Sequence, residues 1–131
     1  MHSSQIERKL AAIMFTDIAG YTALSAKDST KASELLTTQR NTLKPIVEKH
    51  GGSWMKEIGD GLLLTFDSAT SAVECSIAIQ EATKDIDDLN LRIAIHQGEV
   101  IKQDGDVIGD YVNVTSRIEP FSAVGGVAIS D

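Results

Sequence analysis

Two glycines that flank an aspartate constrain the fold of this 131-residue chain most, because they join two strand-like runs. The turn Gly59-Asp60-Gly61 separates residues 53–58 from the apolar residues 61–66. A tight glycine-containing turn between two extended runs is typical of a β-hairpin, whose strands are antiparallel neighbours. We therefore expect the fold to contain an antiparallel sheet.

The rest of the chain alternates between helical and extended hydrophobic periodicity. Residues 9–17 are apolar on both faces, as expected of a central strand that is covered on two sides. Long helices are predicted where apolar residues recur at helical spacing and a capping residue precedes them. The expected elements are a strand over 9–17, a turn and short helix over 20–27, a helix from Asp28 or Ser29 to Gly51-Gly52, strands over 53–58 and 61–66, a helix over 69–86 capped by Asp67 or Ser68, a strand over 91–102, a turn at Asp104-Gly105, a helix over 110–121 and a strand over 127–130.

Without the short helix, the first six predicted elements follow the order β-α-β-β-α-β. This order predicts an α+β, ferredoxin-like (palm-like) core with an additional helix and strand. In such a core both helices pack on one face of an antiparallel sheet, and the first and third strands lie side by side at its centre. Asp17, at the end of the first strand, should then approach Asp60 in the hairpin turn, although 60 − 17 = 43 residues separate them.

Composition excludes several classes of protein. The formal net charge of −7 argues against a general nucleic-acid binder, which would carry a basic face. No apolar run reaches the roughly 18 to 20 residues that span a bilayer, and the N-terminus lacks the apolar core of a secretory signal. One cysteine, Cys75, cannot form an internal disulfide, which favours a reducing, cytoplasmic location.

Asp17 and Asp60 are the residues most indicative of chemistry. Each follows a strand-like run and lies beside backbone that a glycine makes flexible. Two carboxylates in such positions suit Mg²⁺, which prefers hard oxygen ligands and often shares them with substrate phosphates. The alternative is structural, with Asp17 as a helix N-cap and Asp60 as a turn residue.

Four segments together resemble the catalytic domain of class III nucleotidyl cyclases, the adenylyl and guanylyl cyclases. They occur in the order of the family and cover nearly all of the chain from Lys9 onward. Each segment alone is a weak signal, but the four together are specific. The segments are Phe15–Thr22, Lys56–Gly61, Arg92–Val100 and Asp106–Arg117.

The resemblance implies a two-metal site. Asp17 and Asp60 would ligate two Mg²⁺ or Mn²⁺ ions, and the backbone carbonyl of Ile18 would add one more ligand. One ion would lower the pKa of the ribose 3′-hydroxyl and orient it, while the other would bind the triphosphate.

The resemblance also implies residues that bind the nucleotide. The backbone N–H groups of Gly20, Tyr21 and Thr22, at a helix start, would hold phosphate, although Gly20 could equally be a turn former. Lys56 would donate to a ring nitrogen of adenine, and Asp106 would accept from its exocyclic amine. Guanylyl cyclases tend to carry glutamate and cysteine at these positions, so the pair favours ATP. The structural alternatives are a solvated lysine and a turn aspartate.

Asn113 and Arg117 lie four residues apart and therefore on one face of the predicted helix over 110–121. The resemblance implies that Asn113 orients the ribose ring. Arg117 would stabilise charge on the phosphoryl group in the transition state, rather than serve only as a surface ion-pair partner.

Spacing within the hairpin bears on the oligomeric state. Lys56 and Asp60 are about 13 Å apart in an extended strand, too far to contact one nucleotide easily. The family architecture implies a head-to-tail homodimer with two composite sites and an inactive monomer. One protomer would supply the metal aspartates, and its partner would supply Lys56, Asp106, Asn113 and Arg117.

We expect residues 1–131 to form a single catalytic domain that lacks the C-terminal strands usual in the family, and with them a lysine that contacts the triphosphate. Regulatory domains not present in this chain are a further expected partner. The expected activity is conversion of ATP to 3′,5′-cyclic AMP and pyrophosphate, weakened or lost if the absent strands are essential. The alternatives are a non-catalytic nucleotide-binding or dimerisation module of the cyclase fold, and a guanylyl cyclase.

Overall fold

The computed structural model of the chain describes residues 6–103, 106–108 and 125–130, with side chains described over 10–98 and 125–129. The predicted helix over 110–121 lies outside this part of the chain, and so do Asn113 and Arg117. The described elements, in chain order, are β1 (Ile6–Ile18), α1 (Tyr21–Lys27), α2 (Ser29–Lys49), β2 (Ser53–Ile58), β3 (Gly61–Phe66), α3 (Ala69–Thr83), β4 (Leu91–Gln103), β5 (Asp106–Ile108) and β6 (Val127–Ser130).

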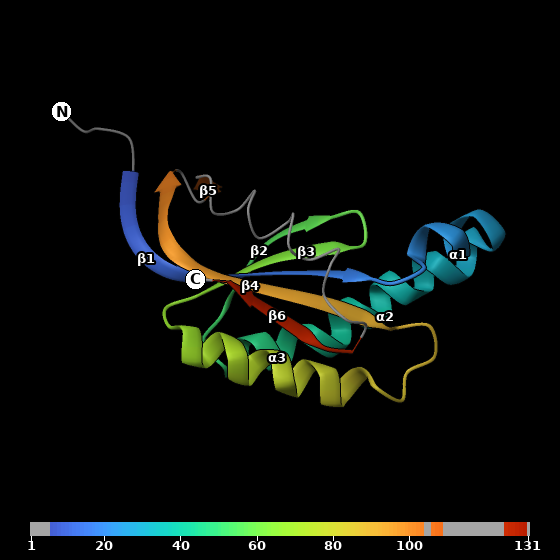
Figure 1. Ribbon diagram of the computed structural model, residues 1–131. Coiled ribbons are helices and arrows are strands. Elements are labelled where there is room, and N and C mark those ends of the chain that lie inside the picture. The colour runs from blue at the N-terminus through green and yellow to red at the C-terminus, as the bar shows by residue number, and fades with distance from the viewer. Residues whose placement is uncertain (1–5, 104–105, 109–124, 131) are drawn as a thin grey trace.

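The strands form one sheet with the order β2-β3-β1-β4-β5, and β6 pairs with β4 beside this path. The pairings along the path are antiparallel, whereas β6 runs parallel to β4. The central position of β1 and the β-α-β-β-α-β order confirm the predicted ferredoxin-like core (Figure 1).

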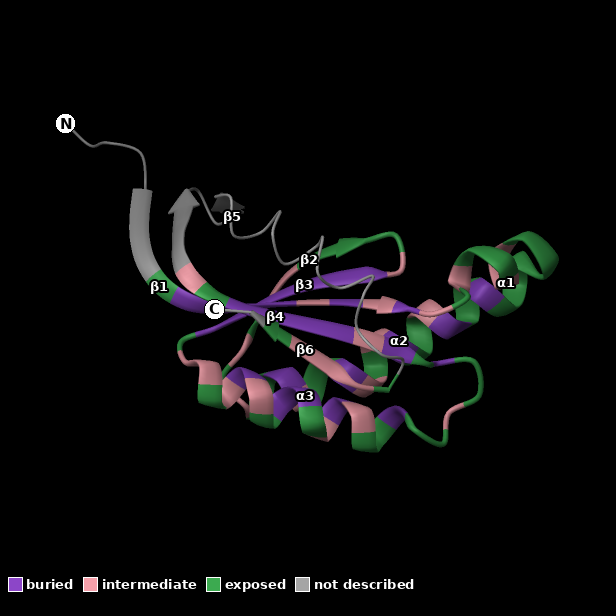
Figure 2. Cartoon of the chain, viewed as in Figure 1, coloured by how far each residue is buried: buried purple, intermediate pink, exposed green. Residues whose placement is uncertain are grey.

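The two long helices, α2 and α3, pack on the same face of the sheet (Figure 1). Alternate residues of the central strands point toward them, because successive side chains in a strand face opposite sides. Figure 2 shows the resulting buried layer along β3, β1 and β4. The largest side chains that are almost fully buried in this layer are Met14, Leu43, Leu62, Leu64, Phe66, Ile79, Leu89, Leu91, Ile93 and Ile95.

The opposite face of the sheet carries a second, smaller apolar cluster. Its buried members are Ala11, Ile13 and Leu63, and the half-buried Phe15 and Met55 pack against them. Asp17 belongs to this face, because it follows Ala11, Ile13 and Phe15 at the two-residue period of the strand. The candidate metal ligand therefore lies on the face that α2 and α3 leave uncovered.

The predicted N-cap residues mark the starts of both long helices. The Asp28 carboxylate accepts a hydrogen bond from the Lys31 backbone N–H at 3.0 Å, so Asp28 caps α2. The Ser68 hydroxyl caps α3 by accepting from the Ser71 N–H at 3.1 Å. These two bonds satisfy backbone donors that a helix start leaves without partners.

The observed elements differ from the prediction mainly in the end of α3, the start of β1 and the presence of β5. Helix α3 ends at Thr83 rather than at residue 86, because the aspartate-rich residues 85–88 are poor helix formers. Strand β1 begins at Ile6, since it pairs with β4 along its whole length. The short strand β5 was not predicted, and it arises where Asp106–Ile108 folds back on β4.

Two adjacent glycines after α2 provide a test of the packing. A Cβ at Gly52 would lie 2.5 Å from the Phe66 ring and 2.8 Å from Val47, whereas Gly51 has φ 73° and no heavy atom within 4 Å of such a Cβ. Gly52→Ala should lower the free energy of unfolding by about 1–3 kcal/mol through overpacking. Gly51→Ala should cost about 1–2 kcal/mol through backbone strain alone.

Urea unfolding measures both effects, and a crystal structure of each variant would locate the strain. A Gly52→Ala protein that unfolds like the wild type, with Phe66 unmoved, would contradict the close packing described above.

Candidate active site

The hairpin turn lies against the end of β1, as the sequence predicts. The Ile18 backbone N–H donates a 2.9 Å hydrogen bond to Asp60 Oδ2, which joins residues 42 positions apart. This bond brings the Asp60 carboxylate to the peptide that links Asp17 and Ile18. The predicted approach of the two strand ends is therefore confirmed.

Gly61 permits this close contact. A Cβ at this position would lie 3.2 Å from the carbonyl oxygens of Ile58 and Thr16, and 3.3 Å from the Phe15 ring. Few side chains tolerate such contacts with backbone, so glycine allows the turn to rest directly on β1. The sequence predicts a glycine turn here, and the structure shows in addition that a side chain at Gly61 would collide with the backbone of β1.

Asp17 forms a bidentate ion pair with Arg92, its direct cross-strand neighbour on β4. Arg92 Nε donates to Asp17 Oδ1 at 2.8 Å, and Nη2 donates to Oδ2 at 2.9 Å. The side chains are 19% and 28% exposed, so the pair is partly buried. A paired guanidinium of this geometry is among the stronger interactions of a carboxylate.

Lys56 lies on the same sheet face as Asp17. Strand β2 shifts register between Trp54 and Lys56, with Met55 as the bulged residue. Trp54 therefore packs toward the main core, Met55 packs in the second cluster, and Lys56 is registered opposite Leu63 of that cluster. A bulge of this kind redirects side chains within a strand.

Helix α2 is bonded to strand β2 close to the turn, through Arg40 and Glu57. Arg40 forms two hydrogen bonds to the Glu57 carboxylate, at 2.8 and 2.7 Å, and the Trp54 indole N–H adds a third at 3.2 Å. The hydrogen bond from Arg40, with smaller help from Trp54, lowers the pKa of Glu57 although partial burial opposes it. Lys44 lies 5.8 Å from the centre of the Trp54 ring.

Gln39, the residue before Arg40, reaches the turn itself. Its Nε2 donates to the Asp60 backbone carbonyl at 3.5 Å. The side chain is buried, and its Oε1 has no hydrogen-bond partner within the described part of the chain. Sequence reasoning gave no role to Gln39, Arg40 or Arg92, because their partners are distant in the chain.

The oxygen atoms gathered here suit a hard divalent cation. They are the carboxylates of Asp17 and Asp60, with the carbonyl of Ile18 beside them, and oxygen is the ligand type that Mg²⁺ and Mn²⁺ prefer. Among the residues that the structure describes, no group of three or more His, Cys, Asp and Glu side chains could hold a metal.

Of the other predicted site residues, three lie at the start of α1 and one begins β5. Gly20 adopts a left-handed conformation with φ 78° immediately before α1, so Tyr21 and Thr22 form the first turn of that helix. Asp106 opens β5 and pairs in register with Gln103, but its side chain is outside the described set.

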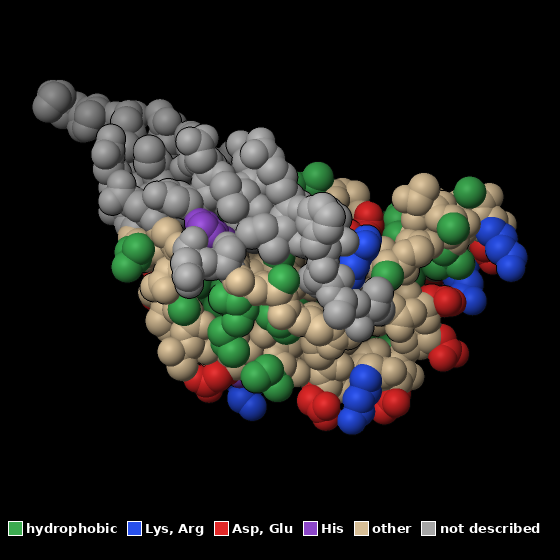
Figure 3. Space-filling view, in the orientation of Figure 1, with side chains coloured by type: hydrophobic (Ala, Val, Ile, Leu, Met, Phe, Trp, Pro, Cys, Tyr) green, Lys and Arg blue, Asp and Glu red, His purple; other side chains and the backbone are tan. Residues whose placement is uncertain are grey.

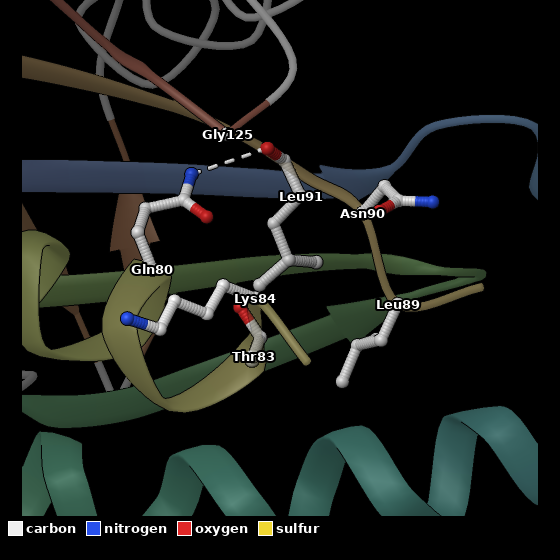
Figure 4. Close-up of a pocket in the computed structure, with 7 residues that line it drawn as sticks. All are labelled: Gln80, Thr83, Lys84, Leu89, Asn90, Leu91 and Gly125. Atoms are coloured by element: carbon white, nitrogen blue, oxygen red, sulfur yellow. Dashed lines mark hydrogen bonds between the residues drawn. The ribbon is translucent and has the colours of Figure 1, made fainter. Parts of the chain in front are cut away.

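A separate cavity of about 220 Å³ lies near the C-terminal end of α3 (Figure 4). Gln80 Nε2 bridges two carbonyl oxygens there, at 3.1 Å from Leu91 and 3.0 Å from Gly126. Within the described part of the chain, none of the predicted site residues lines this cavity, and no carboxylate is among its lining residues. The lining residues are Gln80, Thr83, Lys84, Leu89, Asn90, Leu91 and Gly125.

The face shown in Figure 3 carries acidic and basic side chains side by side along its lower edge. The coloured part of this face shows no extended basic patch of the kind that general nucleic-acid binders use. Over the described residues, no helix is both long and apolar enough to cross a membrane.

Comparison with known proteins identifies the family. The family model of the adenylate and guanylate cyclase catalytic domain matches residues 4–131. The chain belongs to this family, which confirms the class III nucleotidyl cyclase resemblance.

The similar proteins include both kinds of cyclase. A Rhizobium meliloti (strain 1021) protein named "Putative adenylate cyclase 3" is 40% identical over the whole chain, which spans 24% of that relative's length. The solved adenylate/guanylate cyclase/hydrolase from Silicibacter pomeroyi is 35% identical, with a TM-score of 0.86 over 97% of this chain and 78% of that one. The solved guanylyl cyclase Cya2 is 25% identical, with a TM-score of 0.86 over 95% of this chain and 76% of that one.

The Asp17–Arg92 pair can be tested by a double-mutant cycle with Asp17→Asn and Arg92→Met. Because the pair is bidentate and partly buried, we expect a coupling of about 1–3 kcal/mol in the free energy of unfolding. Urea unfolding at low and high salt measures it.

The Arg40–Glu57 pair is a matched control, with the same bidentate geometry but 42% and 34% exposed side chains. Its cycle, with Glu57→Gln and Arg40→Met, should give a smaller coupling that falls further with salt. Equal couplings for the two pairs would show that burial does not distinguish them.

Proposed function

We propose that this chain is the catalytic domain of an adenylyl cyclase, which converts ATP to 3′,5′-cyclic AMP and pyrophosphate. The observation that carries the proposal is the bond from the Ile18 N–H to the Asp60 carboxylate, within a chain that belongs to the cyclase family. It holds the Asp60 carboxylate at the peptide that follows Asp17, so that aspartates of two family motifs lie near each other, and carboxylate oxygen is a ligand type that suits a divalent cation. The domain would span residues 1–131.

In the reaction, the ribose 3′-hydroxyl gives up its proton to solvent and its oxygen attacks the α-phosphorus. The new P–O bond closes the cyclic phosphodiester, the bond from the α-phosphorus to the oxygen bridging it to the β-phosphorus breaks, and pyrophosphate leaves. Asp17, Asp60 and the Ile18 carbonyl would hold two Mg²⁺ or Mn²⁺ ions. When bound, such ions lower the pKa of the 3′-hydroxyl and neutralise the triphosphate. Arg92 would have to share or release Asp17 when a cation binds, because both need the same carboxylate oxygens.

Lys56 and Asp106 support ATP rather than GTP as the substrate. The Lys56 ammonium would donate to a ring nitrogen of adenine, and the Asp106 carboxylate would accept from the exocyclic amine. Guanine offers the opposite polarity at the equivalent edge, which would leave buried donors or acceptors unpaired. Lys56 lies on the same sheet face as Asp17, so a second copy that packs on this face would bring its Lys56 toward the Asp17 and Asp60 of the first.

The remaining predicted residues would act on the sugar and the phosphates. The first turn of α1, with the backbone N–H groups of Gly20, Tyr21 and Thr22, would contact phosphate. Asn113 would orient the ribose, and Arg117 would neutralise charge that develops on the phosphoryl group in the transition state.

The site would be complete only in a homodimer. Asp17 and Asp60 would act with Lys56, Asp106, Asn113 and Arg117 of a second copy, so that each dimer has two composite sites. Use of ATP, together with the single buried thiol of Cys75, suits a domain that works in the reducing cytoplasm. Regulatory domains in a longer protein are expected partners.

Two other functions are distinguishable from this one. A guanylyl cyclase would turn over GTP faster than ATP, and guanylyl cyclases are among the similar solved structures. A non-catalytic module would bind ATP without making product.

The direct test is incubation of the pure protein at high concentration with ATP and Mn²⁺, followed by chromatography for cyclic AMP. Asp17→Ala should lower the rate at least about 100-fold, because it removes a ligand of the reacting centre. Asp87→Ala removes a carboxylate from an exposed loop and should leave the rate unchanged. Bound ATP without product would favour the module, and faster use of GTP would favour the guanylyl cyclase.

Complementation tests the composite site. Asp60→Asn and Arg117→Ala should each be inactive alone, but half of the dimers in an equal mixture are mixed and have one intact site of two. The mixture should therefore recover about a quarter of the wild-type rate. A mixture no more active than its two components would contradict the shared site.

A further inference from the structure

We propose that Gln39 is a positioning residue for Asp60, and that it holds the hairpin turn where the Asp60 carboxylate can reach a divalent cation. The inference rests on the proposed function, because it takes Asp60 as a metal ligand. Gln39 itself contacts neither metal nor nucleotide in this proposal, and it acts through the Asp60 backbone.

Gln39 occupies an unusual place for a polar side chain. It lies in the buried stripe of α2 and is only 3% exposed. Buried amides normally have hydrogen-bond partners at both ends, because removal from water is otherwise costly. The other buried residues of this stripe are the apolar Ala32, Leu35, Leu43 and Val47.

The amide of Gln39 is only half satisfied. Nε2 donates one long bond, 3.5 Å, to the Asp60 carbonyl, while Oε1 is buried and finds no partner among the described residues. One such bond returns less free energy than an unpaired buried carbonyl costs. Gln39 is therefore a poor choice for stability alone, and violations of this kind are expected where a residue serves a functional site.

The turn is contacted from both the β1 side and the α2 side. From the β1 side it is held by the Ile18 N–H bond to the Asp60 carboxylate and by the close packing of Gly61. Arg40 holds Glu57, which lies on β2 two residues before Gly59 and pairs with Leu62, so it acts on the strand beside the turn and not on the turn itself. Gln39 alone among these helix residues bonds to the turn residue that carries the ligand.

Gln39→Met tests the inference, because methionine fills a similar volume without a donor. The full chain without nucleotide is titrated with Mn²⁺, and the free ion is measured by electron paramagnetic resonance. We expect the dissociation constant to rise by roughly two- to tenfold, the equivalent of one neutral hydrogen bond. The Tm without metal should stay unchanged or rise, because the unpaired Oε1 is also removed.

Two further variants make the result decisive. Ser76→Ala removes a buried hydroxyl of α3 that bonds to Val73 of its own helix, and it should leave Mn²⁺ binding unchanged. Asp60→Asn should abolish most binding. If Asp60→Asn binds Mn²⁺ as the wild type does, the proposed metal site is wrong and this inference falls with it. If Asp60→Asn loses binding but Gln39→Met does not, only the inference is overturned, and a lower Tm with unchanged binding would indicate a structural role.

A measurement on the wild-type protein avoids any question of folding. In ¹⁵N spectra, the side-chain NH₂ signals of Gln39 should shift on titration with Mg²⁺. Those of Gln80, whose amide bridges Leu91 and Gly126 beside the other cavity, should not. A Gln39 signal that stays in place at saturating Mg²⁺ would overturn the proposal.

Discussion

The register of β1 against its two neighbours is the constraint on which the candidate site depends. Thr16 pairs with Leu62, which places the hairpin turn beside the end of β1, and Asp17 pairs with Arg92. A slip of one residue in either pairing would send the Asp17 side chain to the helix-covered face. The apolar alternation of β1 therefore does more than build a core, because it also decides where the carboxylate points.

The bulge at Met55 allows strand β2 to contact helix α2 on one face and to present side chains on the other. Trp54 and Glu57 turn toward α2 and fix the strand to the domain, whereas Met55 and Lys56 turn toward the uncovered face. A regular strand would alternate and could not place both pairs in this way. The same six-residue strand thus serves as an anchor and as a candidate binding surface.

Most of the fold could be predicted from interactions between residues close together in the chain. The caps at Asp28 and Ser68, the hairpin turn and the central strand depend on neighbours in the chain, and the structure confirms them. Arg92 and Gln39 could not be assigned, because their partners lie 75 and 21 residues away and only the folded register brings them together. The approach of Asp60 to Asp17 was predictable only because the element order implied a specific sheet.

The ion pair between Asp17 and Arg92 has a consequence for how the domain is made. Some small metalloproteins fold only when their ion binds, because the free energy of metal binding is part of their free energy of folding. Here a guanidinium already neutralises one carboxylate, and a backbone N–H satisfies the other. The described residues thus give each aspartate a partner without a cation. On the proposed function, a cation would then be needed for turnover rather than for folding.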